Sequence, residues 1–315
     1  MKYLKHLFLA VIFLTHTLMA GPAPKKVVIV LPMAHQALDA IVSGFSKRLT
    51  ELMPGQVMIR VENAMGDPTI QQSILKKLNQ QKVDLVVPVS TQTALMAAQQ
   101  IKGRKMVSLA AMYSEKERRQ AGITGVLDEV PIQKLLQFYR KILPQLSHLT
   151  LVCSDSDKVQ KEAAEAIIEA EKMGIQLKVL TVHTLSDLYA LSKQIGRNKG
   201  PVFILKDNMV ASGIAGLLRT ASNQKKLVLS SDEGTVSEGV PIGLGVIESD
   251  IGVEGAGLAH RVLSGEKIEE IPLQRIEKIH VFIHGPALKE VGIDLKAVQH
   301  AAKDLGYVLK VRGVK

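Results

Sequence analysis

Short polar side chains that follow apolar runs are the groups of this sequence best suited to bind a ligand. Ser90 and Thr91 follow one run and could offer hydroxyl and backbone N–H groups to a carboxylate at a helix start. Asp207 and Asp232 follow two other runs and could pair with an ammonium group. Such a combination would suit a zwitterion. All four residues are also favoured helix N-caps, so capping stays open as the alternative interpretation.

Further candidates come from the same kind of position. Tyr113 follows another apolar run and could stack on a flat ligand or a cation, with a surface tyrosine as the alternative. His35 could hydrogen-bond a ligand or lie in a solvated loop. The candidate ligand-binding residues are His35, Ala37, Leu38, Ser90, Thr91, Gln92, Met112, Tyr113, Ser154, Asp207, Asn208, Ser231, Asp232 and Glu233.

Catalytic and metal-binding patterns are missing from the sequence. It contains no G-x-x-x-x-G-K-[ST] or G-x-S-x-G string, and no G-x-G-x-x-G follows the first apolar run. The single cysteine, Cys153, excludes an intramolecular disulfide and a cysteine-based zinc site. His280 and His284 are four residues apart across a predicted strand end, where that spacing does not place both on one face. We therefore predict no enzyme, no metal and no cofactor.

The elements that must position the candidate groups alternate between short apolar runs and helical periodicity. Continuous apolar runs, typical of strands buried on both faces, predict first-half strands at 27–31, 57–61, 85–89 and 106–110. Helical spacing predicts helices at 38–52, 70–78 and 91–101. The second half repeats the rhythm, with strands at 149–153, 177–182, 202–205 and 227–229 and helices at 157–173, 184–195 and 209–222. The tail adds strands at 242–247 and 278–283 and a helix at 252–263.

Consecutive βα units predict parallel sheets with right-handed crossovers. The fold class is therefore α/β, with two doubly wound parallel-sheet lobes and a hinged cleft between them. We expect residues 25–128 and 235–265 in the first lobe, and residues 129–234 and 266–315 in the second. Ligands of such sheets lie beyond the carboxyl ends of the strands, so the candidate residues should face one another across the cleft.

Composition excludes several classes of protein. The 315 residues are 46% hydrophobic and 22% charged, which excludes disorder as the main state. The net charge is +10, yet only 3% of residues are aromatic and tryptophan is absent, which argues against a stacking platform for nucleic acid.

The first twenty residues are typical of a secretory signal. Lys2 and Lys5 precede a nearly wholly apolar stretch at 7–14, and Ala20 supplies a small residue at a plausible cleavage point. This stretch is shorter than the roughly 20 residues of a membrane span, with an uncleaved anchor as the alternative. Because exported proteins without disulfides fit a bacterial periplasm, we predict a periplasmic protein.

Several short strings, in their order and spacing, resemble the type I periplasmic substrate-binding proteins of ABC transporters, in the tryptophan/tyrosine-type branch. The strings are 37–40 with 44–45, 63–68, 83–86 with 90–91, 124–126 with 143–144, 207–210, 236 with 239, and 263–267 with 271–272. Two segments depart from the family pattern. Met112-Tyr113-Ser114 stands where Thr-Asp-Pro is usual, and Ile247-Glu248-Ser249 where Asp-Tyr-Tyr is usual.

The resemblance implies a hinged, non-catalytic receptor that closes on a small solute and delivers it to an inner-membrane ABC permease. The solute class that it implies is an amino acid, aromatic or related, and we expect a monomer that binds no nucleic acid. The alternative is a solute-sensing accessory protein that presents its closed form to a membrane receptor or kinase without transport. A sugar-repressor relative would share the lobes, but a signal-like segment occupies the place of its helix-turn-helix headpiece.

Overall fold

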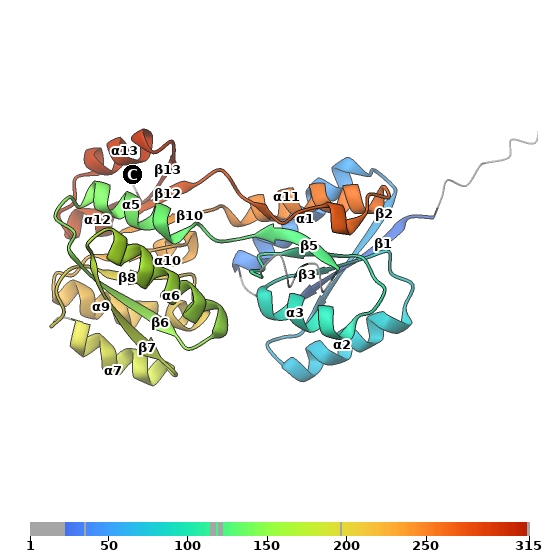
Figure 1. The fold of residues 1–315 in the computed structure, drawn as a ribbon, viewed down its shortest axis with the longest axis horizontal. Coiled ribbons are helices and arrows are strands. Elements are labelled where there is room, and N and C mark those ends of the chain that lie inside the picture. Colours follow the sequence, from blue (N-terminus) through green and yellow to red (C-terminus); the bar gives the residue numbers. More distant parts are fainter. Residues whose placement is uncertain (1–22, 35, 114–117, 119–121, 196, 314–315) are drawn as a thin grey trace, which may run out of the picture.

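The computed structural model describes residues 23–34, 36–113, 118, 122–195 and 197–313. Two α/β lobes lie side by side, joined by several chain crossings (Figure 1). Both lobes have a sheet at the centre and helices on its faces, as the alternating pattern predicts. Within the described ranges no helix is both long and apolar enough to span a membrane.

The first lobe is built on an all-parallel sheet. Its strands lie in the order β11-β5-β4-β3-β1-β2. The strands are β1 (Lys25–Leu31), β2 (Val57–Asn63), β3 (Leu85–Pro88), β4 (Met106–Leu109), β5 (Ile123–Leu127) and β11 (Gln274–Arg275). The helices are α1 (Gln36–Leu52), α2 (Pro68–Gln80), α3 (Thr91–Gln100), α11 (Glu248–Leu263) and the short 3-10 helix η1 (Ile268–Glu270).

The second lobe has a seven-stranded sheet in the order β13-β12-β10-β9-β8-β6-β7, parallel except between β10 and β12. Its strands are β6 (His148–Ser154), β7 (Gln176–Val182), β8 (Val202–Ile204), β9 (Val228–Ser230), β10 (Ile242–Gly245), β12 (His280–His284) and β13 (Val308–Arg312). The helices are α5 (Ile132–Ile142), α6 (Asp157–Lys172), α7 (Leu185–Ile195), α8 (Asn208–Ser212), α9 (Ile214–Asn223), α10 (Glu233–Ser237), α12 (Gly285–Glu290) and α13 (Leu295–Asp304).

Sheet membership corrects the expected lobe boundaries. Strand β10 lies in the second sheet, because the five-residue helix α10 returns the chain directly to the edge of β9. Strand β11 lies in the first sheet, where Gln274 and Arg275 pair with the end of β5. The chain therefore crosses between the lobes after β5, between β10 and α11, and between β11 and β12.

Helix α11 returns to the first lobe and packs closely on α1 (Figure 1). Glycine makes this approach possible, because a Cβ on Gly252 would lie 2.0 Å from the carbonyl oxygen of Ile41 and one on Gly44 would lie 2.3 Å from that of Ser249. Phe45 of α1 and Ile251 of α11 are both buried in the same apolar core. This packing fixes the first turn of α11, including Glu248, next to the crossings.

Candidate functional site

A cavity of about 540 Å³ lies between the two lobes, beside the crossing that follows β5. Thr91, Met112 and Tyr113 line it from the first lobe. The crossing residues 128–131, the first turns of α6 and the segments after β8 and β9 line it from the second-lobe side. The carboxyl ends of both sheets thus face one space, which is where parallel sheets place their ligands.

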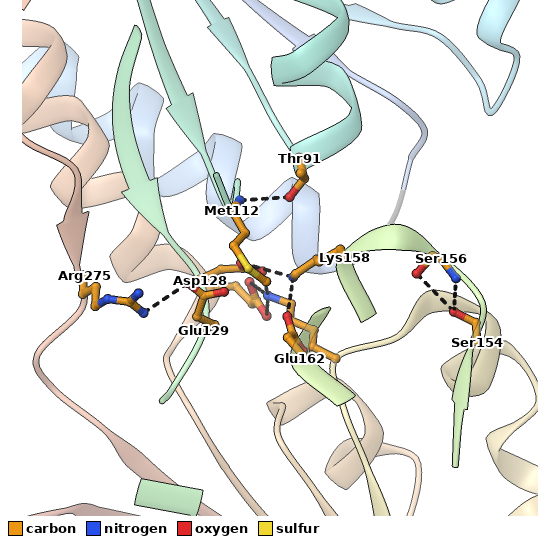
Figure 2. Close-up of polar contacts among 11 residues, drawn as sticks. Thr91, Met112, Asp128, Glu129, Ser154, Ser156, Lys158, Glu162 and Arg275 are labelled. Carbon is orange, nitrogen blue, oxygen red and sulfur yellow. Dashed lines mark hydrogen bonds and ion pairs between the residues drawn. The ribbon is translucent and has the colours of Figure 1, made fainter. Parts of the chain in front are cut away.

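At the centre of this site is the buried carboxylate of Asp128, which is held between two lysines. Figure 2 shows its contact with one of them, Lys158. Its Oδ2 lies 2.9 Å from the Nζ of Lys206, and its Oδ1 lies 3.4 Å from the Nζ of Lys158. Burial by itself would raise the pKa of Asp128, but the two ammonium groups hold it far below its ordinary value. Asp128 is therefore ionised at every physiological pH.

Lys206 is shared between two carboxylates from different parts of the chain. Besides Asp128, its Nζ lies 2.9 Å from an oxygen of Glu248, in the first turn of α11. Burial opposes the charge of Lys206, yet these two carboxylates raise its pKa well above the ordinary value. For Glu248 burial outweighs the lysine, and its pKa is raised. The three groups connect the crossing after β5 with the crossing before α11.

Two further carboxyl groups line the cavity. Glu129 accepts a hydrogen bond from Nη1 of Arg275 at 3.1 Å, across the neighbouring strands β5 and β11 (Figure 2). Glu162 lies one turn after Lys158 on α6, with an oxygen 3.7 Å from that lysine's Nζ. Burial raises the pKa of both carboxyl groups, that of Glu162 to about 7. Glu162 is thus half-protonated near neutral pH.

The first-lobe wall is organised by the start of α3. Ser90 caps this helix and has a φ of 83°, and its hydroxyl oxygen accepts from the backbone N–H of Thr93. The hydroxyl oxygen of Thr91 accepts from the backbone N–H of Met112 at 2.9 Å (Figure 2). The hydroxyl of Tyr113 is hydrogen-bonded to that of Ser108, so this ring lines the wall with its polar end turned to the strand.

The structure brings only some of the sequence-predicted residues to the cavity. Those that line it are Thr91, Met112, Tyr113 and Ser231. The others among the described residues lie outside its lining, and they are Ala37, Leu38, Ser90, Gln92, Ser154, Asp207, Asn208, Asp232 and Glu233. Leu38 packs against the first-lobe core, and Gln92 and Asn208 are exposed. His35 lies outside the described residues.

The two candidate aspartates act as helix caps. Asp207 is buried, and its carboxylate accepts from the backbone N–H groups of Ser154, Met209 and Val210. Asp232 caps α10 by accepting from the backbone N–H and the hydroxyl of Thr235. Of the two open interpretations, capping is the one whose contacts are present.

Two more candidates have structural partners. The carboxylate of Glu233 forms ion pairs with Lys310 and Arg312 on the edge strand β13. The hydroxyl of Ser154 donates a hydrogen bond to the hydroxyl of Ser156. Both serines lie apart from the charged residues around Asp128 (Figure 2).

The charged residues of the cavity were not among the sequence candidates. Asp128 follows β5. This strand was not predicted, because Thr124 and Gly125 interrupt its apolar run. Lys158 and Glu162 are spaced i, i+4 at the start of α6, a pattern that places both on one helix face and could have been used. Lys206 directly follows the predicted strand at 202–205 and precedes Asp207, so the segment that contained a chosen candidate also contained this lysine.

The histidines His280 and His284, four residues apart, form no metal site in the part of the chain that the structure describes. No cluster of three histidine, cysteine, aspartate or glutamate residues there could hold an ion. The imidazole Nδ1 of His284 instead accepts from the backbone N–H of Ala287 as the cap of α12. Burial lowers the pKa of His280, which favours the neutral imidazole.

A family model described as ABC transporter substrate binding protein matches residues 26–303. The chain belongs to this family. A Rickettsia prowazekii (strain Madrid E) protein named RP367, uncharacterized, is 31% identical over 277 residues, 88% of each chain. A tyrosine-binding protein of Clostridioides difficile (strain R20291) is 24% identical over 267 residues, 81% of this chain and 77% of the relative.

Solved structures show the same fold. A conserved domain protein from Vibrio cholerae superposes with a TM-score of 0.79 at 23% identity, covering 91% of this chain and 99% of the other. An ABC domain from Streptococcus pneumoniae in complex with L-Trp gives a TM-score of 0.77 at 21% identity, covering 88% and 98%. The predicted α/β fold with two parallel-sheet lobes, of the type I periplasmic-binding class, is confirmed, as is the family resemblance.

Proposed function

We propose that this protein is a periplasmic solute receptor of an ABC uptake system, which closes on an amino acid and delivers it to an inner-membrane permease. The observation that carries the proposal is the cavity between the lobes, lined from both sides and by the crossing between them. A solute bound there contacts both lobes only when they are closed, so its binding energy favours the closed state. Membership of the substrate-binding family supports the same conclusion.

The charges of the cavity support a zwitterionic solute. Lys161 lines it, is exposed, and has no ion-pair partner among the described residues, so it is available to a solute carboxylate. The start of α3 at Thr91 adds the positive end of a helix dipole on the opposite wall. The carboxyl groups of Glu129 and Glu162 are available to an ammonium group. The L-Trp and tyrosine named for two relatives are solutes of this kind.

Export, partner and assembly complete the proposal. The signal-like first twenty residues support a periplasmic location, and the family supports an ABC permease as the partner. We propose that the receptor acts as a monomer without enzymatic activity; the lining of the cavity by both lobes of one chain supports the monomer.

The proposal is tested on protein purified from the periplasm of expressing cells. Thermal shift against the common amino acids and small organic acids should reveal a ligand, because a tight ligand raises the melting temperature by mass action. Calorimetry then gives its affinity. If no compound of the panel shifts the melting temperature, the receptor function is refuted.

A pair of variants on α3 ties binding to this cavity. Leu95 lines the cavity and is 39% exposed, so Leu95→Trp adds bulk at the wall without disturbing the core. Gln92→Trp adds the same group on the same helix outside the cavity. We expect the first to weaken binding about tenfold, equal to about 1.4 kcal/mol, and the second to leave it unchanged.

Uptake distinguishes transport from sensing. Deleting the gene should reduce uptake of the radiolabelled solute if the protein feeds a permease. Unchanged uptake of a solute that the purified protein binds would instead favour the sensing function.

A further inference from the structure

The cations around the cavity centre are already committed to carboxylates. Lys206 is shared by Asp128 and Glu248, and Lys158 lies 3.4 Å from Asp128. Arg275 donates to one oxygen of Glu129. The positive charges at this point of the site therefore leave little capacity for an anionic ligand group.

Two carboxylate oxygens of residues that line the cavity have no donor. Oε2 of Glu129 and Oε1 of Glu162 are inaccessible to solvent and accept no hydrogen bond. Lys158 Nζ lies 3.7 Å from the latter oxygen, beyond hydrogen-bonding distance. Glu162 is only 7% exposed, and both residues, which Figure 2 labels, line the cavity. A buried acceptor without a donor is unfavourable by about 1–3 kcal/mol, so the site gains free energy when a ligand supplies one.

We infer that Glu129 and Glu162 together form the subsite for a protonated amine, so that the receptor selects solutes with an ammonium group and rejects their desamino analogues. The inference rests on the proposed solute-binding function and adds to it the group by which solutes are chosen. The two residues come from the crossing and from α6, so an ammonium group between them would also connect the hinge to the second lobe.

The electrostatics of Glu162 give the subsite a pH dependence. Burial raises its pKa to about 7, so half of the empty receptor carries a neutral Glu162 at that pH. An ammonium group at hydrogen-bonding distance stabilises the ionised form, so binding releases a proton. The charged groups around Glu162 in the cavity or its ion network are Asp128, Glu129, Asp157, Lys158, Lys161, Glu165, Lys206, Glu248 and Arg275.

Three matched probes test the selection of the amine. L-phenylalanine carries both charged ends, phenethylamine lacks the carboxylate, and 3-phenylpropionate lacks the amine. The corresponding trio is used for whichever amino acid binds most tightly. We expect the desamino acid to bind at least about tenfold more weakly than the amino acid, because the two oxygens then stay unpaired.

The pH dependence is the second measurement. Glu162 titrates at about 7 in the empty receptor and is ionised when a solute is bound. The affinity for the solute should therefore rise about tenfold between pH 6 and pH 8. Calorimetry at pH 7 in phosphate and in Tris should show release of about half a proton per solute bound.

A matched pair of variants on α6 assigns the effect. Glu162→Gln should remove both the proton release and the rise with pH, and should weaken binding at pH 8. Glu169→Gln, two turns further along and paired with Lys172 outside the cavity, should behave as the unaltered protein. Circular dichroism checks folding. If Glu162→Gln does not fold, Glu129→Gln tests the subsite by the preference for the amino acid over the desamino acid, which it should reduce.

The outcomes separate the two proposals. If the desamino acid binds as tightly as the amino acid, or if Glu162→Gln keeps the proton release, the ammonium subsite is refuted while the receptor function stands. If no solute of any class binds, the receptor function fails and the inference with it.

Discussion

Replacing Glu162 by glutamine should make the protein more resistant to unfolding at alkaline pH. In the folded protein burial raises the pKa of this carboxyl group from 4.5 to about 7. Glutamine has nearly the same shape and cannot ionise. The substitution therefore removes one titration and leaves the packing of α6 almost unchanged.

The sign follows from which state holds the proton. Below pH 4.5 the carboxyl group is protonated in both the folded and the unfolded chain, so it adds no pH dependence. Between pH 4.5 and 7 the unfolded chain has lost the proton while the folded chain keeps it, so the free energy of unfolding falls as pH rises. Above pH 7 both are ionised, and the accumulated loss is about 3 kcal/mol.

Equilibrium urea unfolding at half-unit steps from pH 4.5 to 8.5 measures this loss. The difference in unfolding free energy between Glu162→Gln and the unaltered protein should grow by about 3 kcal/mol across the range. Glu169→Gln on the same helix serves as the control. A difference that is constant with pH would refute the assignment of a buried, high-pKa carboxyl group to this site.

Two other substitutions test the packing and the capping. Gly252→Ala should lower the unfolding free energy by about 2 kcal/mol, because its Cβ would lie 2.0 Å from the carbonyl oxygen of Ile41. Gly257→Ala on the same helix has no atom within 4 Å and should raise it by about 0.5–1 kcal/mol. Equal urea midpoints for the two would contradict the close packing of α1 and α11. Asp207→Ala should cost about 1–2 kcal/mol of stability through the lost cap, yet leave solute affinity unchanged by calorimetry. A tenfold loss of affinity would place Asp207 back in the binding site.

Much of the fold was predictable because buried parallel strands have continuous apolar sequences. The runs at 27–31 and 149–153 correspond to β1 and β6, and the helical spacing at 157–173 corresponds to α6. Strands β5 and β11 were missed for a physical reason. The first contains Thr124 and Gly125, and the second is a polar pair at a sheet edge, so neither forms an apolar run.

The location of the candidate site at the carboxyl ends of the strands was predictable, but the residues that line it were predicted only in part. Thr91, Met112 and Ser231 line the cavity because each follows a strand whose carboxyl end faces the other lobe. Asp207 and Asp232 follow strands as well, but their carboxylates turn back to the backbone of the next helix. The sequence gives the place of a residue after a strand, but only the structure gives the direction of its side chain.

The sequence by itself determined the two-lobed α/β plan and the family, because periodicity and strand composition act over a few residues at a time. Only the tertiary structure decided the charge pattern of the cavity. Asp128, Lys206 and Glu248 are far apart in the chain and meet because two of the crossings and the segment after β8 lie together in space. The pKa of Glu162 likewise depends on burial between elements that no local pattern relates. Electrostatics in a buried site is a property of distances in space, and those arise only when the lobes are assembled.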